Sequence, residues 1–205
     1  MVYQALKIFA KDGKKDLHIT CDNCIAQNKN NLSLFFWAWL YMLGWYNNIT
    51  INFMIPGHTK FICDAFFGQI KKSYRVHEVN TVNDIYHIIN KSSIGNEGLR
   101  YNNKLGWKWY NFQDFFSKNF VNLPHLTDYY HFRFSNLSQN LGKVYCFKIS
   151  SDTKISYNLL YNNNFNIYKE LNILDIVPLS DERKKYLYTK ICKYVNNEFK
   201  DTYFL

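Results

Sequence analysis

The sequence lacks an apolar run long enough to cross a bilayer. Its most apolar stretch, Leu32–Trp45, is shorter than the ~20 residues that a membrane-spanning helix needs. The first residues, MVYQALK, do not combine a basic region with an apolar run, so we expect no secretory leader. These absences predict an intracellular protein, in the nucleus or the cytoplasm, without membrane contact.

The cysteines do not form the pattern of a secreted, disulfide-rich domain. There are five of them, an odd number: Cys21, Cys24, Cys63, Cys146 and Cys192. We therefore expect reduced thiols. The sequence also lacks internal repeats and long low-complexity tracts, and 47% of its 205 residues are hydrophobic. A packed globular fold is expected, and wholesale disorder is not.

Acidic residues are fewer than basic ones, and the formal net charge is +9. A positive surface favours polyanions such as nucleic acid. However, the sequence is rich in Asn, Lys, Ile, Tyr and Phe, which A/T-rich codons encode. Because codon bias alone can raise the lysine count, the charge by itself carries little weight.

The first half of the chain alternates between helix and strand patterns. The spacing of apolar residues predicts helices over 2–10, 32–46, 59–75 and 81–90, and strands over 17–21 and 49–55. The 32–46 segment is apolar on every face, so this helix should be deeply buried. Such alternation is typical of an α/β fold with a mixed sheet flanked by helices.

The pattern changes after about residue 92. A short helix is expected within 109–120, followed by β-strands over 129–135, 143–150 and 154–161, and by a final helix that begins at Ser180. We therefore predict a core over residues 1–92 and, over 93–205, a C-terminal α+β extension with a few antiparallel strands. The extension should pack on or next to the core.

Two aspartates stand out by position. Asp22 follows a predicted strand directly, and Asp64 lies early in the helix that follows the next strand. If the two strands are parallel neighbours, both carboxylates can face one edge of the sheet. Paired carboxylates there suit Mg²⁺ or Mn²⁺, which take oxygen ligands and assist phosphodiester chemistry. The alternative is structural: Asp22 forms an Asx turn, and Asp64 caps or solvates its helix.

The amino-acid sequences of two segments point to a family. DNCIAQNKN at 22–30 and GHTKFICDAFFG at 57–68 match the motifs D-N-C-x-x-Q-N-K-N and G-H-T-x-F-x-x-D-x-x-F-G. The chain thus resembles the transposon-associated domain of unknown function DUF7869. A weaker likeness continues at residues 130–134 and 179–188.

The resemblance implies a ribonuclease H-like fold of the transposase and integrase kind. Such folds place one acidic residue on the first strand, one after the fourth strand and one on a later helix. Asp22 maps to the second and Asp64 to the third, but no residue of this chain maps to the first. We therefore expect an N-terminally truncated domain that is inactive alone. An upstream segment or a protein partner would complete the sheet.

Other polar residues can be placed around the same predicted edge. His58 is a candidate for phosphate contact or proton transfer, and otherwise for a backbone hydrogen bond at a strand end. Asn23 is a candidate for orienting Asp22 or binding a metal-bound water. Candidates for holding a nucleic-acid backbone are Gln27, Asn28, Lys29, Lys60, Lys71, Lys72 and Arg75. Their alternative roles are helix capping, solvation and, for the last three, pairing with a helix dipole.

A zinc site is a competing interpretation. Cys21, Cys24, His58 and Cys63 have the residue types that zinc prefers, but buried thiols without a metal are the favoured interpretation. Four aromatic residues are candidates for base stacking, with core packing favoured: Trp107, Trp109, Phe112 and Phe115.

Three hypotheses follow for the function. The first is a fragment or remnant of a mobile-element nuclease or transposase, which would bind nucleic acid, with DNA favoured, and use Mg²⁺ or Mn²⁺. The second is a domesticated, non-catalytic module that binds nucleic acid or another protein. The third is a structural domain whose fold is stabilised by a zinc site.

Overall fold

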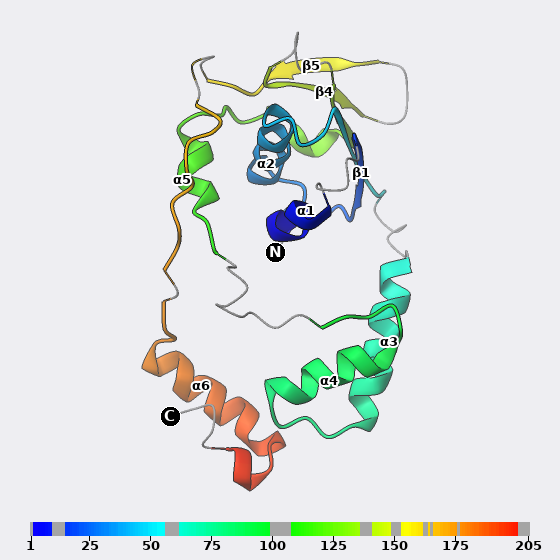
Figure 1. The fold of residues 1–205 in the computed structure, drawn as a ribbon, viewed down its shortest axis with the longest axis vertical. Coiled ribbons are helices and arrows are strands. Elements are labelled where there is room, and N and C mark those ends of the chain that lie inside the picture. Colours follow the sequence, from blue (N-terminus) through cyan, green and yellow to red (C-terminus); the bar gives the residue numbers. More distant parts are fainter. Residues whose placement is uncertain are drawn as a thin grey trace. The chain divides into compact units, whose positions relative to one another are not determined.

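The computed structural model describes residues 2–9, 15–55, 62–98, 108–135, 141–148, 153–161, 164, 166–175 and 177–200. The described helices are α1 (Val2–Phe9), α2 (Asn31–Met42), α3 (Ile62–Val76), α4 (Val82–Ser92), α5 (Phe112–Ser117) and α6 (Asp181–Ile191), with short 3₁₀ turns at Leu126–Asp128, Cys192–Tyr194 and Asn197–Phe199. The strands are β1 (Asp16–Cys21), β2 (Asn48–Phe53), β3 (His131–Phe134), β4 (Lys143–Phe147) and β5 (Ile155–Asn158) (Figure 1). Helices and strands together confirm an α/β fold.

The chain forms two compact units. The first contains residues 1–59 and 108–174, and the second contains residues 60–107 and 175–205. The first unit holds the whole sheet with α1, α2 and α5, whereas the second holds α3, α4 and α6. These units divide the chain differently from the core and extension that the sequence predicted, because each is built from two separate stretches of chain.

The sheet of the first unit has the order β1-β2-β3-β4-β5. β1 and β2 are parallel, with Cys21 opposite Phe53, and every other neighbouring pair is antiparallel. Strands from both sides of residue 92 thus belong to one mixed sheet, since β3 pairs directly with β2. Among the described residues, β1 has a strand neighbour on one side only, so it is an edge of this sheet.

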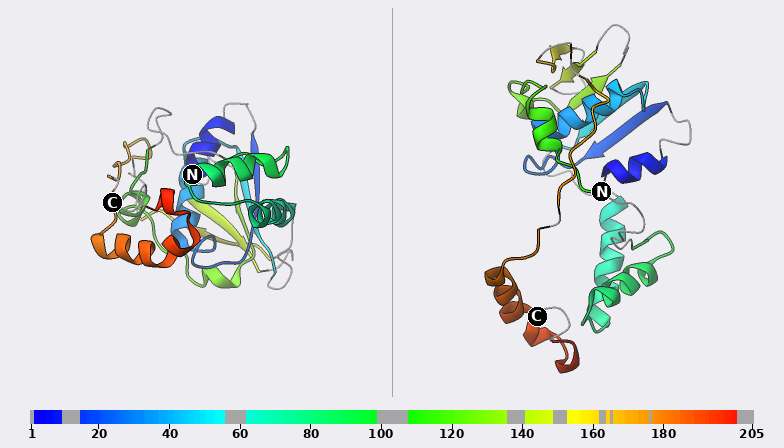
Figure 2. Two further views of the ribbon diagram at one scale, coloured as in Figure 1. Left: turned by 90° about the horizontal axis from the view of Figure 1, so that it is seen from below. Right: turned by 60° about the vertical axis from the view of Figure 1, so that its left-hand side comes forward.

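Helix α2 forms the centre of the core, as its sequence predicts. Seven of its residues are buried, from Leu34 to Met42, and the helix begins at Asn30, whose side chain accepts a 2.9 Å hydrogen bond from the Ser33 amide. The helix packs against the inner sheet residues, including Ile49, Ile51 and Phe132, which are at most 1% exposed. Helices α1, α2 and α5 lie on the same side of β1 (Figures 1 and 2).

Aromatic rings fill the space between α2 and the segment around α5. Phe35 stacks on Phe120 with ring centroids 5.0 Å apart, and Trp39 meets Phe116 edge to face at 5.9 Å. Of the aromatics considered for base stacking, Phe112 and Phe115 belong to this core, and Trp109 is 44% exposed. Trp107 lies outside the described residues.

In the second unit, local sequence sets the helix ends. Helix α4 begins with a capping box: the Thr81 hydroxyl accepts from the Asp84 amide at 3.2 Å, and the Asp84 carboxylate accepts from the Thr81 amide at 2.7 Å. Helix α6 begins at Ser180, whose hydroxyl accepts from the Arg183 amide at 3.3 Å, as predicted. These caps satisfy amides that the first helical turn leaves without partners.

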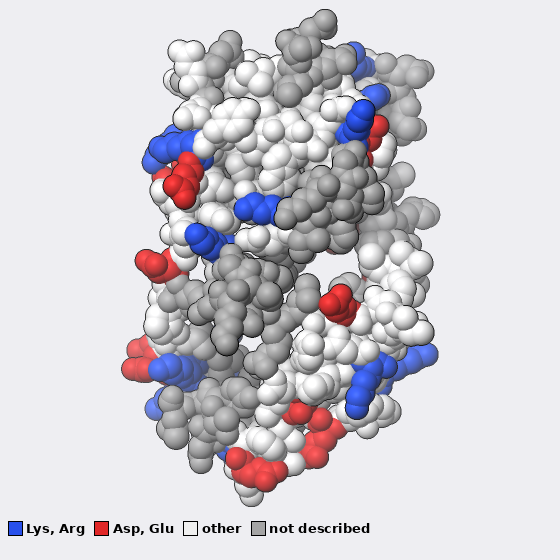
Figure 3. Space-filling view, in the orientation of Figure 1, with Lys and Arg blue, Asp and Glu red and all other residues white. Residues whose placement is uncertain are grey.

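One face of the molecule can be followed for its charged side chains, and the described helices for their apolar length. On the face drawn in Figure 3, Lys and Arg side chains are interspersed with Asp and Glu rather than gathered in one patch. None of the described helices combines the length and the apolar character that crossing a bilayer requires.

Candidate functional site

Asp22 lies directly after β1, at the carboxyl end of the parallel β1–β2 pair. One of its oxygens, Oδ1, accepts a hydrogen bond from the Cys24 amide at 3.3 Å and another from Asn28 Nδ2 at 2.5 Å. The bond to the amide two residues ahead makes an Asx turn, which is the structural alternative weighed for this residue. The carboxylate is therefore held in a fixed orientation at the strand end.

The residue after Asp22 carries an unsatisfied polar atom. Asn23 Oδ1 is shielded from solvent, and no described residue forms a hydrogen bond with it. A buried carbonyl oxygen without a partner costs about 1–3 kcal/mol, and a water or a cation would remove that cost. The strand end thus presents two neighbouring side chains with oxygen atoms, Asp22 and Asn23, of the kind that hard cations bind.

The loop from Cys24 to Asn30 is closed by its own backbone. The Cys24 carbonyl accepts from the amides of Gln27, Asn28 and Lys29 at 3.3, 2.8 and 3.0 Å. Asn30 Nδ2 donates to the Gln27 carbonyl at 3.2 Å while Asn30 also caps α2. The polar residues of this motif therefore stabilise the turn that connects Asp22 to α2.

Lys29 points into the protein instead of lying at a solvent-exposed rim. Its side chain is 2% exposed, its ammonium donates to the Thr127 carbonyl at 2.7 Å, and it lies 4.2 Å from the centre of the Tyr130 ring. Burial lowers the pKa of this ammonium, and the nearby Asp128 carboxylate only partly opposes that effect. Lys29 was expected to contact a nucleic-acid backbone. Because its side chain is buried in this structure, it could do so only after becoming exposed.

The second predicted aspartate belongs to the other unit. Asp64 lies in the first turn of α3 and is exposed. Asp22 is in the first unit and Asp64 in the second, so the meeting of their carboxylates stays a prediction. His58 and Lys60 lie outside the described residues.

The basic end of α3 is exposed, as its predicted role requires. Lys71, Lys72 and Arg75 are all exposed and occupy the last turns of the helix. Cations at this end also interact favourably with the helix dipole. The position fits both a contact with nucleic acid and the dipole effect.

The cysteines proposed as alternative zinc ligands are distributed over both units. Cys21 and Cys24 are half-buried in the first unit, whereas Cys63 is exposed in the second. Burial raises the pKa of the Cys21 thiol, with a smaller contribution from Asp22, which favours the neutral thiol over the thiolate that zinc binds. Within the described part of the chain, no group of three or more His, Cys, Asp or Glu side chains is arranged to hold a metal ion.

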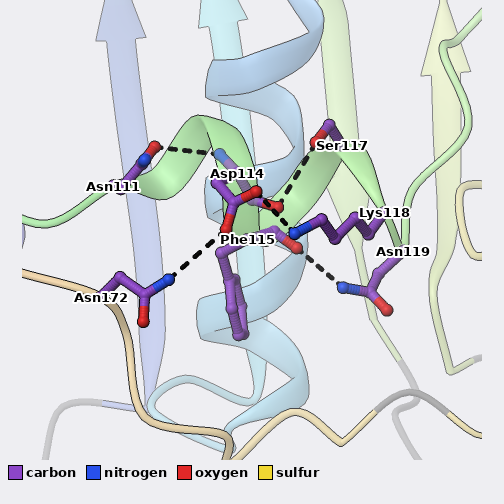
Figure 4. Close-up of polar contacts among 7 residues, drawn as sticks. All are labelled: Asn111, Asp114, Phe115, Ser117, Lys118, Asn119 and Asn172. Carbon is purple, nitrogen blue, oxygen red and sulfur yellow. Dashed lines mark hydrogen bonds and ion pairs between the residues drawn. The ribbon is translucent and has the colours of Figure 1, made fainter.

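A polar cluster that the sequence did not reveal surrounds Asp114 on α5 (Figure 4). Its carboxylate lies 2.7 Å from Lys118 Nζ and accepts from Asn172 Nδ2 at 3.5 Å, while its amide donates to Asn111 Oδ1 at 3.0 Å. The hydrogen bond from Lys118 is the main cause that lowers the pKa of Asp114. The cluster fastens the chain around residue 172 to α5, which is a structural role.

The second unit contains a hollow of about 770 Å³ between the end of α3, the start of α4 and the end of α6. Its lining is mostly apolar and includes Tyr74, Ile85 and Ile191. None of the predicted catalytic, metal-binding or nucleic-acid-binding residues lines this hollow. The candidate site therefore remains the strand end at Asp22.

Comparison with known proteins gives a family but no activity. The family model described as "Domain of unknown function (DUF7869)" matches residues 1–152, which include the loop at Asp22 and the start of α3. The weaker likeness at residues 179–188 lies beyond that match. Neither the curated proteins nor the solved structures contain a significant match. With the larger part of its length matched, the chain belongs to the DUF7869 family.

Proposed function

We propose that this chain is a nuclease-derived domain of mobile-element origin, with a ribonuclease H-like sheet, that binds nucleic acid and uses Asp22 as a cation ligand. The observation that carries the proposal is the pair of oxygen-bearing side chains, Asp22 and Asn23, at the carboxyl end of parallel strands. Open sheets that contain parallel strands place their ligands at this end. The order strand, helix, strand, helix over β1, α2, β2 and α3 supports the proposal.

In this scheme the chain's own groups have separate roles. Asp22 supplies a negative oxygen to Mg²⁺ or Mn²⁺, Asn23 supplies a neutral oxygen to the ion or to a water on it, and Asn28 keeps the Asp22 carboxylate oriented. The second carboxylate that the sequence predicted, Asp64 on α3, is tested separately by its own variant. A bound divalent ion would polarise a phosphodiester and activate water.

Exposed basic residues would hold the nucleic-acid backbone. Lys71, Lys72 and Arg75 at the end of α3 are the described candidates with the required exposure. Contacts of this kind position the substrate without reading its sequence. Binding should accordingly weaken as salt is added, because each neutralised phosphate releases counterions.

A second candidate function is a non-catalytic module that binds nucleic acid. The Asx turn favours this candidate because it gives Asp22 a structural role. Asp22 Oδ1 already accepts two hydrogen bonds from the loop that follows β1. In this scheme Asp22 is kept for the fold. Nucleic acid would then bind equally well with and without a divalent cation.

Binding of Mn²⁺ separates the two candidates. Free Mn²⁺ can be followed by electron paramagnetic resonance during titration of the full chain, the Asp22→Asn and Asp64→Asn variants, and Asp175→Asn as a matched control at an exposed position. Asp22→Asn keeps an oxygen that can accept from Asn28, so the fold should survive while the charge is lost. We expect wild type and Asp175→Asn to bind Mn²⁺ equally, and Asp22→Asn to lose binding.

The contrary result is equally clear. If Asp22→Asn binds Mn²⁺ as tightly as the wild type, or if the wild type binds none, the cation site is refuted and the non-catalytic module remains. A loss of binding in Asp64→Asn as well would place both carboxylates at one ion. Nicking of supercoiled DNA in the presence of Mn²⁺ then tests whether bound metal leads to phosphodiester hydrolysis.

A further inference from the structure

The sheet of the first unit has a second face that does not contribute to the apolar core. Alternation along the strands sends Ile49, Ile51 and Phe53 inward, with exposed fractions of 7% or less. The intervening residues point to the other face. In β1 these are Asp16, His18 and Thr20, all of them exposed.

Strand register aligns the outward residues into rows across the sheet. In one row, the paired residues are His18, Thr50, Arg133, Tyr145 and Ser156. In the next, they are Thr20, Asn52, His131 and Phe147. We call these two rows, together with Lys143 and Lys154, the outer sheet face. It carries hydroxyl, amide, imidazole, cationic and aromatic groups.

The aromatic side chains of this face are separate from the core. Tyr145 and Phe147 are half-buried and are not among the residues packed against the buried cluster. They lie two residues apart on β4 and hence on the same face. Two cations lie near Tyr145, because Lys154 Nζ is 4.2 Å and Lys143 Nζ 5.8 Å from its ring centre.

The charge of the outer sheet face is positive. Arg133 is exposed near its middle, and Lys143 and Lys154 lie by the Tyr145 ring. The acidic side chain that β1 adds nearby, Asp16, accepts a 2.7 Å hydrogen bond from Asn48 Nδ2 and keeps its charge, but the three cations outnumber it. His131 is held in place through its Nδ1, 2.8 Å from Asn52 Oδ1. A polyanion is therefore the complementary partner.

We propose that the outer sheet face binds single-stranded nucleic acid. Flat sheets bind single strands through aromatic rings that stack on unpaired bases and cations that contact the backbone. Tyr145 and Phe147 provide the rings, and Arg133, Lys143 and Lys154 provide the cations. A duplex keeps its bases stacked on one another, so it cannot use the rings. The proposal shares its substrate class with the proposed function but needs neither Asp22 nor a metal.

The test measures binding of a fluorescein-labelled oligothymidylate to the full chain by fluorescence anisotropy, in EDTA and at low salt. We expect Tyr145→Leu to weaken binding roughly 5- to 150-fold, the range found for losing one stacked base. Arg133→Gln should also weaken binding, and it should reduce the salt dependence of binding. The matched controls are Tyr168→Leu, at a side chain that is 77% exposed in the same unit, and Lys185→Gln on α6. Both controls should bind like the wild type.

A second measurement covers the case in which a face variant does not fold. An oligonucleotide containing 5-iodouridine is photo-cross-linked to the wild-type chain, and the modified peptides are identified by mass spectrometry. We expect the modification in the peptide that contains Tyr145 and Phe147. Cross-links confined to other peptides overturn the proposal.

Three further results would also overturn it. They are no binding by the wild type, wild-type affinity in both face variants, and stronger competition by a duplex than by a single strand of the same length. The two proposals can fail separately, because the oligothymidylate titration is done in EDTA, where no divalent ion can bind at Asp22.

Discussion

Lys29 illustrates how a motif residue can serve the fold. Its side chain extends from the loop after β1, and its ammonium donates a hydrogen bond to the Thr127 carbonyl, 98 residues further along the chain. The ammonium also lies over the Tyr130 ring. Removing an ammonium from water is costly, and the lowered pKa of Lys29 reflects that cost. The hydrogen bond, the ring contact and the burial of the aliphatic stem offset it.

Two substitutions at Lys29 separate these contributions. Lys29→Met keeps the stem and removes the charge, so we expect the free energy of unfolding to stay within about 1 kcal/mol of the wild type. Lys29→Ala also removes the packed stem and should lose roughly 2–4 kcal/mol. Urea denaturation measures both. Equal losses in the two variants would show that the charge, not the stem, holds the loop.

At the scale of elements, the turn between β1 and α2 is fixed by side-chain amides. Asn30 caps α2 and also donates to the carbonyls of Ile25 and Gln27, both at 3.2 Å. Asn31 continues the pattern by accepting from the Leu123 amide at 2.8 Å. Asn30, the last residue of the family motif, and Asn31 directly after it thereby set the direction in which the chain leaves the candidate site.

The two functions of Asn30 can be separated by mutation. Asn30→Asp keeps the capping oxygen but loses the donor, whereas Asn30→Ala loses both. We expect Asn30→Ala to cost about 1–2 kcal/mol of unfolding free energy and Asn30→Asp to cost less. Thermal unfolding followed by circular dichroism gives the order of stability. A greater loss in Asn30→Asp than in Asn30→Ala would contradict the capping role.

At the scale of the whole molecule, buried tyrosine and cysteine side chains link stability to alkaline pH. Burial raises the pKa of Tyr41 from 10.0 and of Cys146 from 9.0, in each case to about 12. Both side chains are fully buried. At a pH between the unfolded and the folded pKa of such a group, the group is deprotonated in the unfolded chain and still protonated in the folded one. The unfolded chain therefore binds fewer protons. Stability is therefore fully present below the unfolded pKa values and falls as pH rises toward 12.

We expect the free energy of unfolding to decrease between pH values of about 9 and 12, by on the order of 3 kcal/mol for each of the two groups. Lys29 opposes this trend, because its pKa is lowered by burial. Tyr41→Phe should make the decrease shallower. It should also leave stability at neutral pH unchanged or higher, since the Tyr41 hydroxyl is buried without a hydrogen-bond partner among the described residues.

Urea denaturation over this pH range provides the measurement. Tyr168→Phe is the matched control, because that side chain is 77% exposed. An alkaline slope in Tyr41→Phe as steep as in the wild type would show that ionisation of Tyr41 does not limit stability.

The sequence by itself determined much of the secondary structure. A segment that is apolar on all sides must be buried, which fixed α2, and alternating β-branched and aromatic residues fixed β2. Ser180 marked the start of α6, because its hydroxyl suits an uncapped helical amide. The position of Asp22 after β1 could also be read directly, since it depends on where one strand ends.

Only the tertiary structure decided which distant segments meet. It joined β3 to β2 across the division expected at residue 92, buried Lys29 against Thr127 and arranged Arg133 and Tyr145 side by side on the outer sheet face. Periodicity reports which side of an element is apolar, but it does not report the partner of that side or the register of two strands. The partner and the register depend on contacts between residues far apart in the chain. Such contacts become favourable only when the whole unit packs.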